Sequence, residues 1–233
     1  MKKTVVSYSQ FRFSRLREQR FSHLWLLLGW VGYLLLYFLT ENLIPAEKCH
    51  VIHCALDDLI PFHEGFLIFY CFWYAYLVLT LLYFFLYDIP SFKRLQVYII
   101  ITQAVAMAVY ILYPSIQLQR PEVFPRDNLL TRLLGFIYRV DTPTGVCPSL
   151  HVAYSMGIAS VWGRSREASR PFKWFIVVMA VLISVSTTFV KQHSAVDVLL
   201  AVPLGLLAEF VVYGRFPGGK TRLQAWMERD VKQ

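Results

Sequence analysis

Two polar residues that lie four positions apart stand at the start of an apolar run near the end of the chain. They are His193 and Asp197, and the apolar run covers residues 195–213. Side chains four apart share one face of a helix. A carboxylate beside one imidazole nitrogen fixes the tautomer, leaves the other nitrogen with a free lone pair, and stabilises the positive charge that a nucleophilic histidine acquires. The pair therefore predicts a histidine nucleophile oriented by a carboxylate.

A second group of polar residues opens an earlier apolar run with the order Pro148-Ser149-Leu150-His151. Proline and serine are typical of a first helical turn, where main-chain N–H groups lack partners and the helix dipole favours an anion. A phosphate could bind there, with the Ser149 hydroxyl as a further donor. His151 lies in the same turn and could protonate a leaving oxygen, which contributes roughly 10²–10⁴-fold in rate. Arg120, which follows a third apolar run, would add a cation.

Each of these residues also has a structural interpretation. A histidine inside a membrane protein is often a hydrogen-bonded packing residue, and a loop arginine such as Arg120 is usually solvated. Asp197 is harder to explain in this way, because a carboxylate within a span costs a few kcal/mol and is by default paired or functional. The three clusters all stand at ends of apolar runs that face the same side, and this arrangement favours one joint site.

The composition is that of a membrane protein. Hydrophobic residues make up 57% of the 233 residues and charged residues 16%, against about 25% charged in soluble domains. The charged residues gather between long apolar runs, as in a chain that crosses a bilayer repeatedly. The net charge of +8 does not require a nucleic-acid partner, because the basic residues follow the positive-inside pattern. We therefore predict a single membrane domain that covers residues 1–233 and contacts the lipid bilayer.

The apolar runs predict an all-α bundle of six membrane-spanning helices. The fourth run is short and polar, but its polar side can face protein inside a bundle. The first run lacks a small-residue cleavage site and is long enough to span, so we expect no cleavable signal peptide. The six predicted spans are Leu24–Thr40, Gly65–Tyr87, Leu95–Tyr113, Pro148–Gly163, Phe172–Val190 and Ala195–Tyr213.

The basic residues also predict the orientation of the bundle. They concentrate in the first 20 residues, at residues 93–94, at residues 164–173 and in the last 19 residues, which all fall on one side of a six-helix chain. Both termini are therefore expected in the cytoplasm, and the site outside it, in a plasma or cell membrane. The outward segments are Glu41–Glu64, Pro114–Cys147 and the turn at Lys191. Within the second, leucines at helical spacing over Asn128–Tyr138 predict a short helix, either interfacial or simply packed in the loop.

Four cysteines are too few for a disulfide scaffold. Cys49 and Cys54 share an outward loop with His50 and His53, but the spacing matches no common metal site, so a local disulfide or free thiols are favoured. Cys71 lies inside an apolar run, as a small buried hydrophobe would. We expect neither a metal nor a cofactor.

The three polar clusters resemble the signatures of the type 2 phosphatidic acid phosphatase superfamily, which also includes the inositol phosphorylceramide synthases and the vanadium haloperoxidases. The family patterns run Lys-x6-Arg-Pro, Pro-Ser-Gly-His and Ser-Arg-x5-His-x3-Asp. The corresponding segments of this chain, with the spacing within each signature intact, are Tyr113-x6-Arg120-Pro121, Pro148-Ser149-Leu150-His151 and Ser186-Thr187-x5-His193-x3-Asp197. The resemblance covers roughly residues 24–213, and six helices with outward-facing signatures are also a family trait.

The resemblance implies a function and a role for each matching residue. His193 would form a phosphohistidine, Asp197 would orient it, and His151 would protonate the leaving group. Arg120 and Ser149, with main-chain groups, would hold the phosphoryl oxygens, and the membrane members of the family use no metal. The expected activity is hydrolysis or transfer of a phosphate group of a lipid phosphate or pyrophosphate.

The chain departs from the family at three phosphate-binding positions, where Tyr113 replaces a lysine, Thr187 an arginine and Leu150 a glycine. Electrostatic stabilisation of the transferring group is usually the largest catalytic contribution, so a replacement cation is expected. Lys191 is the first choice, and Arg126, Arg132 and Arg139 are the others. The leucine and the weakened first signature look more like the inositol phosphorylceramide synthase branch.

Two other classes remain open, a transporter or scaffold without catalysis, which the missing cations favour, and a proton-relay protein. The sequence leaves open the lipid substrate, the choice between water and an alcohol as acceptor, and a homo-oligomeric state.

Overall fold

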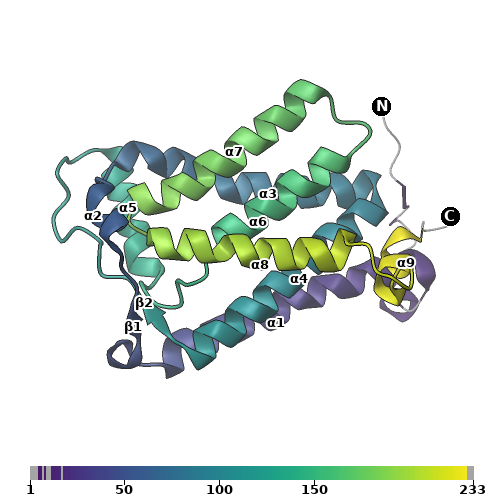
Figure 1. Cartoon of the computed structure of the whole chain (residues 1–233), viewed down its shortest axis with the longest axis horizontal. Helices are drawn as coiled ribbons and strands as arrows, with labels where there is room; N and C mark the ends of the chain where they lie inside the picture. The colour runs from purple at the N-terminus through teal and green to yellow at the C-terminus, as the bar shows by residue number, and fades with distance from the viewer. Residues whose placement is uncertain (1–4, 7, 9–11, 17, 230–233) are drawn as a thin grey trace.

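Long helices dominate the molecule. The computed structural model describes residues 5–6, 8, 12–16 and 18–229, and its helices run side by side along one long axis (Figure 1). The all-α prediction is confirmed, and the two strands, β1 (His50–Val51) and β2 (Ser115–Ile116), form one small parallel pair. The six longest helices are α1 (Leu28–Leu43), α3 (Leu67–Tyr87), α4 (Ile89–Leu112), α6 (Leu150–Arg164), α7 (Arg170–Phe189) and α8 (Ala195–Tyr213).

Five helices of the described chain are long and apolar enough to cross a membrane, which is compatible with a multi-pass integral membrane protein. These stretches are Gln19–Leu43, Glu64–Tyr87, Ile89–Leu112, Arg170–Phe189 and Ala195–Tyr213. The predicted count of six spans is not confirmed, because α6 has 15 residues and a span needs about 20. Helix α6 is instead the centre of the bundle, in contact with α3, α4, α7 and α8.

Helix boundaries follow local capping chemistry. Helix α4 starts at Ile89, six residues before the predicted span, because the Asp88 carboxylate accepts the N–H of Ser91 at 3.1 Å and Pro90 suits the first turn. The helix predicted over residues 128–138 is α5 (Leu129–Val140), where the Asn128 side chain accepts the N–H of Thr131. Short side chains set the close packing of α6, since a Cβ on Gly157 would lie 2.6 Å from the Tyr98 ring.

The two ends of the bundle differ in what covers them. One end carries the strands, α2 (Ala55–Leu59) and α5, and the other carries α9 (Arg222–Glu228) (Figure 1). Arg94 and Arg164 lie at the second end, around a common cavity with the segment that leads into α9. Lys2, Lys3, Arg17 and Lys232, on which the orientation also depends, lie outside the described residues. The cytoplasmic location of the termini stays a prediction.

Candidate active site

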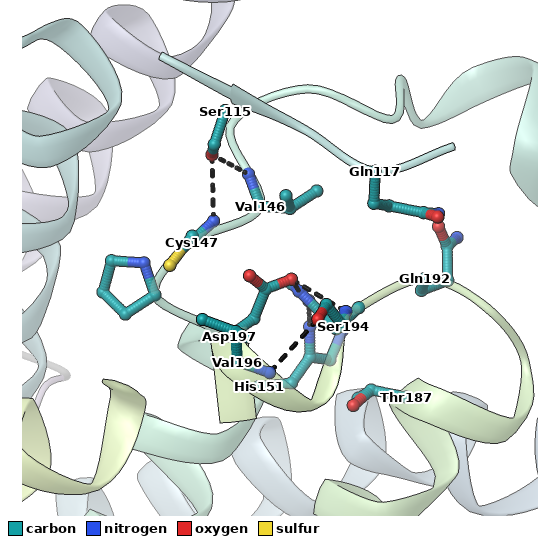
Figure 2. Close-up of polar contacts among 12 residues, drawn as sticks. Ser115, Gln117, Val146, Cys147, His151, Thr187, Gln192, Ser194, Val196 and Asp197 are labelled. Carbon is teal, nitrogen blue, oxygen red and sulfur yellow. Dashed lines mark hydrogen bonds and ion pairs between the residues drawn. The ribbon is translucent and has the colours of Figure 1, made fainter. Parts of the chain in front are cut away.

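The turn between α7 and α8 carries the predicted nucleophile. Nδ1 of His193 lies 3.2 Å from Oδ2 of Asp197, which stands in the first turn of α8 and is fully buried. The same carboxylate oxygen accepts the N–H of Ser194 at 3.0 Å (Figure 2). Two donors therefore fix the carboxylate, and the carboxylate fixes the imidazole so that its Nε2 faces away from α8.

His151 occupies the position that Nε2 of His193 faces. Its Nδ1 lies 3.4 Å from that atom, and the two ring centroids are 5.5 Å apart. Aromatic rings of α3 hold the His151 ring on its other side, with centroids 4.3 Å away for Trp73 and 4.8 Å for Tyr70. Nε2 of His151 is buried without a hydrogen-bond partner in the described chain. The arrangement forms a chain from Asp197 through both imidazoles to an aromatic wall.

Ser149 is the N-cap of α6, which begins at Leu150, two residues after the predicted start at Pro148. Its N–H donates to the carbonyl of Asp197 at 3.1 Å, which ties the start of α6 to α8. Its hydroxyl is buried with no partner in the described chain. Behind it, the Ser115 hydroxyl accepts the N–H groups of Val146 and Cys147, both at 3.2 Å (Figure 2). Strand β2 thereby anchors the segment that enters α6.

Arg120 contacts Gln192, the residue before His193, but its guanidinium is occupied by protein acceptors. Nη1 donates to the carbonyls of Tyr138 and Asp141 at 3.1 and 2.8 Å, and Nη2 donates to Gln192 Oε1 at 2.5 Å and to the Thr142 carbonyl at 3.2 Å. Only the buried Nε has no partner in the described chain. Burial lowers the pKa of Arg120, although Asp141 counteracts this. Arg120 therefore links the end of α5 to Gln192, the residue before His193, by hydrogen bonds.

Lys191 is bound to main-chain carbonyls rather than directed at the histidines. Its Nζ donates to the carbonyls of Asp57 at 3.1 Å and Ile60 at 2.6 Å, and burial lowers its pKa. Its backbone is left-handed, with φ of 51°, and its carbonyl accepts a hydrogen bond from the Gln117 side chain. The role of Lys191 as a replacement cation stays a prediction, because in this arrangement the ammonium group holds the loop after α2.

The other proposed cations also have partners outside the histidine pair. Arg126 pairs with Glu64 at 2.7 Å, Arg132 pairs with Asp127 at 2.8 Å, and Arg139 donates to the Gly135 carbonyl. The two residues that stand where the family has cations do not replace them. Tyr113 stacks on His50 with ring centroids 4.1 Å apart, and the Thr187 hydroxyl donates within its own helix to Ser184.

Asp57, which no sequence pattern singled out, caps α8 from the distant helix α2. Its carboxylate accepts the Ser194 hydroxyl at 2.6 Å, the N–H of Ala195 at 2.7 Å and the N–H of Cys54 at 2.9 Å. Burial alone would raise the pKa of this carboxyl, but the hydrogen bonds from Ala195, Ser194 and Cys54 lower it below its ordinary value. No spacing rule connects residues so far apart, so the only sequence signal was a carboxylate in an outward loop.

A cavity of about 500 Å³ opens beside the histidine pair. Its polar lining includes His151, His193, Gln192, Asp141 and Glu41. Its walls are aromatic residues of α1 and α3, namely Trp30, Tyr33, Tyr37, Tyr70, Trp73 and Tyr74. Helix α1 has no buried residue, so this wall also borders the outer surface of the bundle. A cavity of this size with a few polar groups and aromatic walls is typical of a ligand site.

Asp141 brings a second unpredicted carboxyl to the polar lining of the cavity. It accepts from the Gln192 amide at 3.3 Å and from the Tyr37 hydroxyl at 3.5 Å. Burial raises the pKa of Asp141, and the nearby Arg120 opposes this. An ionised carboxylate here repels a phosphate, whereas the protonated acid can donate a hydrogen bond to one.

The outward loop with the Cys-His pattern is not part of this site. Cys49 and Cys54 are free thiols, and His53 pairs with Asp58 at 2.8 Å. The alternative of a local disulfide is therefore not formed in this structure.

Comparison with protein-family models, with curated proteins and with solved structures found no match for this chain.

Proposed function

We propose that the chain is a membrane phosphatase or phosphotransferase of the type 2 phosphatidic acid phosphatase kind, acting on a lipid phosphate or pyrophosphate through a phosphohistidine. One observation carries the proposal: His193 lies between the buried carboxylate of Asp197 at 3.2 Å and the imidazole of His151 at 3.4 Å. A nucleophile, an orienting carboxylate and a proton donor are the three groups that this chemistry requires.

The proposed reaction has two steps. In the first, the lone pair of His193 Nε2 forms a bond to phosphorus, the bond from phosphorus to the leaving oxygen breaks, and His151 gives its proton to that oxygen. Asp197 stabilises the positive charge on the phosphorylated ring. In the second, water or an alcohol attacks phosphorus, His151 takes the proton of the attacking hydroxyl, and His193 leaves as the neutral ring.

The first step requires the contact between the two histidines to open. A nucleophile stands about 3–3.5 Å from the atom it attacks, and a proton donor about 2.6–3.2 Å from the oxygen it protonates. A phosphoryl group placed between the rings therefore needs more than the 3.4 Å that separates His193 Nε2 from His151 Nδ1. We propose that His151 moves along the wall formed by Trp73 and Tyr70 when the phosphate enters.

The cavity supports a lipid as the substrate. Its lining combines the histidine pair with aromatic residues of α1 and α3, which are both candidate spans. A substrate with a phosphate head and an apolar body fits this distribution of polarity. The positive-inside pattern of the sequence supports a site on the extracytoplasmic side of a cell membrane.

A non-catalytic transporter or scaffold is the second candidate, and the cations are the observation that favours it. Four guanidinium protons of Arg120 go to protein acceptors, and Lys191 Nζ goes to two carbonyls. Phosphoryl transfer with these contacts intact would depend on Arg120 Nε, the Ser149 hydroxyl and main-chain N–H groups.

A release assay separates the candidates. The purified full chain is supplied with lipid phosphates and pyrophosphates, with and without an alcohol acceptor, and phosphate release and new phosphodiester are measured. With a radioactively labelled phosphate substrate, we expect the quenched wild-type chain to carry the label in an acid-labile, alkali-stable bond. The label should be absent from His193→Ala and present in His53→Ala. A phosphodiester product that forms only when the alcohol acceptor is added would assign the inositol phosphorylceramide synthase-like transfer. If none of these substrates gave turnover or labelled protein, the non-catalytic transporter or scaffold would be the remaining candidate.

A further inference from the structure

A second cavity, lined by several cations, lies at the opposite end of the bundle from the histidines. Its volume is about 540 Å³, and it lies where α4 begins, where α6 and α8 end, and where the chain turns into α9. Four basic residues line it, Arg94 from α4, Arg164 from α6, and Arg215 and Lys220 from the segment between α8 and α9. The volume is in the range of small-ligand sites.

The wall of this cavity is held by specific contacts. Gln224 of α9 is buried and donates to the carbonyl of Gly214 at 2.9 Å, which fixes the linking segment against the end of α8. The guanidinium of Arg164 donates to the Ser160 hydroxyl at 2.6 Å and lies 4.1 Å from the centre of the Tyr213 ring. The cations are therefore presented by an ordered frame.

Carboxylates neutralise these cations only in part. Arg164 pairs with Glu209 at 2.5 Å, and Glu228 is shared between Arg94 at 3.5 Å and Lys220. Arg215 is exposed, and within the described part of the chain it has no hydrogen bond or ion pair. Four cations against two carboxylates leave a net positive cavity, which an anion with several oxygens would complete.

We propose that this cavity binds the phosphate of an anionic phospholipid headgroup. Arginine guanidinium groups match phosphate oxygens in pairs, and the lining also includes the apolar side chains of Val212, Tyr213 and Phe216, which suit the start of a lipid tail. The cavity lies at the ends of α4 and α8, both candidate spans, where headgroups stand. The site is separate from the proposed phosphatase chemistry and does not depend on it.

The test is a titration of the purified full chain in neutral detergent, followed by native mass spectrometry. The probes are short-chain phosphatidylglycerol, short-chain phosphatidylcholine and inorganic pyrophosphate. We expect saturable binding of one phosphatidylglycerol and none of phosphatidylcholine. Arg215→Gln removes an exposed cation without breaking a contact of the described chain, so it is expected to fold and to raise the Kd about fivefold. Arg164→Gln should act in the same direction.

Arg166→Gln is the matched control, because Arg166 is exposed at the same end but does not line the cavity. It should change the Kd less than about twofold. His193→Ala should bind the lipid as the wild-type chain does, which excludes the histidine site as the origin of the signal. Saturable binding of pyrophosphate alone, with the same dependence on Arg215, would support the anion site and identify its ligand as soluble. Equal losses in Arg166→Gln and Arg215→Gln, or no saturable binding of any probe, would overturn the proposal.

Discussion

The two ends of the bundle use positive charge in opposite ways. At the histidine end, Arg120 and Lys191 are buried or half-buried and bind main-chain carbonyls of the surrounding loops. At the other end, Arg94, Arg164 and Lys220 pair with carboxylates around an open cavity. Charge at the first end holds together the loops that position the imidazoles, whereas at the second end four cations face two carboxylates and Arg215 has no hydrogen bond or ion pair in the described chain. Basic residues near a proposed phosphate site are therefore not all phosphate ligands.

The largest expected effect is a loss of turnover at the histidine end that leaves lipid binding at the basic end unchanged. His193→Ala should lower kcat by roughly 10³-fold or more, because the nucleophile is the one group that the chemistry cannot replace. Thermal stability and binding of the anionic lipid at the basic end should stay close to wild type. Turnover is measured with phosphate release and stability with a melting curve in detergent. Residual turnover near the wild-type rate would exclude the phosphohistidine.

The next effect tests the role of the second imidazole. His151→Ala should slow esters with poor leaving groups by roughly 10²–10⁴-fold and esters with good leaving groups much less, because the proton is needed only by the poor leaving oxygen. The measurement is kcat across a series of aryl and alkyl phosphates. Equal losses along the series would remove His151 from proton donation and leave it a packing residue against Trp73.

A third prediction concerns the carboxylate that caps α8. Asp57→Ala should destabilise the protein by roughly 3 kcal/mol, because the buried Ser194 hydroxyl and the Ala195 N–H both lose a charged acceptor. The pKa of Asp57 is lowered in the fold, so its contribution is present above the ordinary carboxyl pKa and is lost as pH falls through the lowered value.

The matched control for Asp57 is its neighbour. Asp58 is exposed and pairs only with His53 in the described chain, so Asp58→Ala should change stability by about 0–1 kcal/mol. Unfolding of both variants is followed by melting curves between acidic and neutral pH. A similar loss in both would show that the cap on α8 contributes little.

Substitutions at Lys191 distinguish a structural role, in which its ammonium group holds the end of α2, from a role as a phosphate ligand. In the structural role, Lys191→Met should lower stability by about 1–3 kcal/mol, since two carbonyls lose a charged donor, and should leave KM near wild type. The predicted replacement-cation role requires a strong fall in kcat/KM, with much of it restored in Lys191→Arg. Steady-state kinetics and melting curves on the same preparations decide between them.

The smallest effect is a pH dependence at the histidine end. The pKa of Asp141 is raised, so the wild-type cavity becomes negative, and binds an oxyanion less well, as pH rises through that value. Asp141→Asn should remove this part of the dependence and tighten binding a few-fold at the higher pH. Inhibition by sulfate, whose charge is constant over the range, is the measurement. Glu122→Gln, in the same outward segment and exposed, should leave the profile unchanged.

Local features, and one contact between helices, could be predicted from the sequence. The helices followed from apolar runs and α5 from leucine spacing. A separation of four residues predicted that His193 lies beside Asp197, although His193 stands in the turn before α8 and not on the helix itself. The contact between His193 and His151 joins α6 to the turn before α8, and the shared side of the apolar runs was enough to anticipate it.

The partners of the charged groups could not be predicted from spacing. Arg120 and Lys191 looked like phosphate ligands by residue type, but the loop carbonyls that they bind come from residues 57–60 and 138–142. The count of six spans is not confirmed for a related reason, because a helix surrounded by protein, as α6 is, need not match the thickness of a bilayer. Tertiary contacts decided both features.

The hydrogen bond from Ser194 to Asp57 joins positions 137 residues apart. During synthesis, Asp57 of α2 is made long before Ser194, so the turn that holds His193 can gain this cap only after the start of α8 has been made. Contacts of such long sequence separation carry a larger loop-closure entropy than local ones. A chain that stops before His193 therefore contains His151 without its partner imidazole and Asp57 without the groups that it caps.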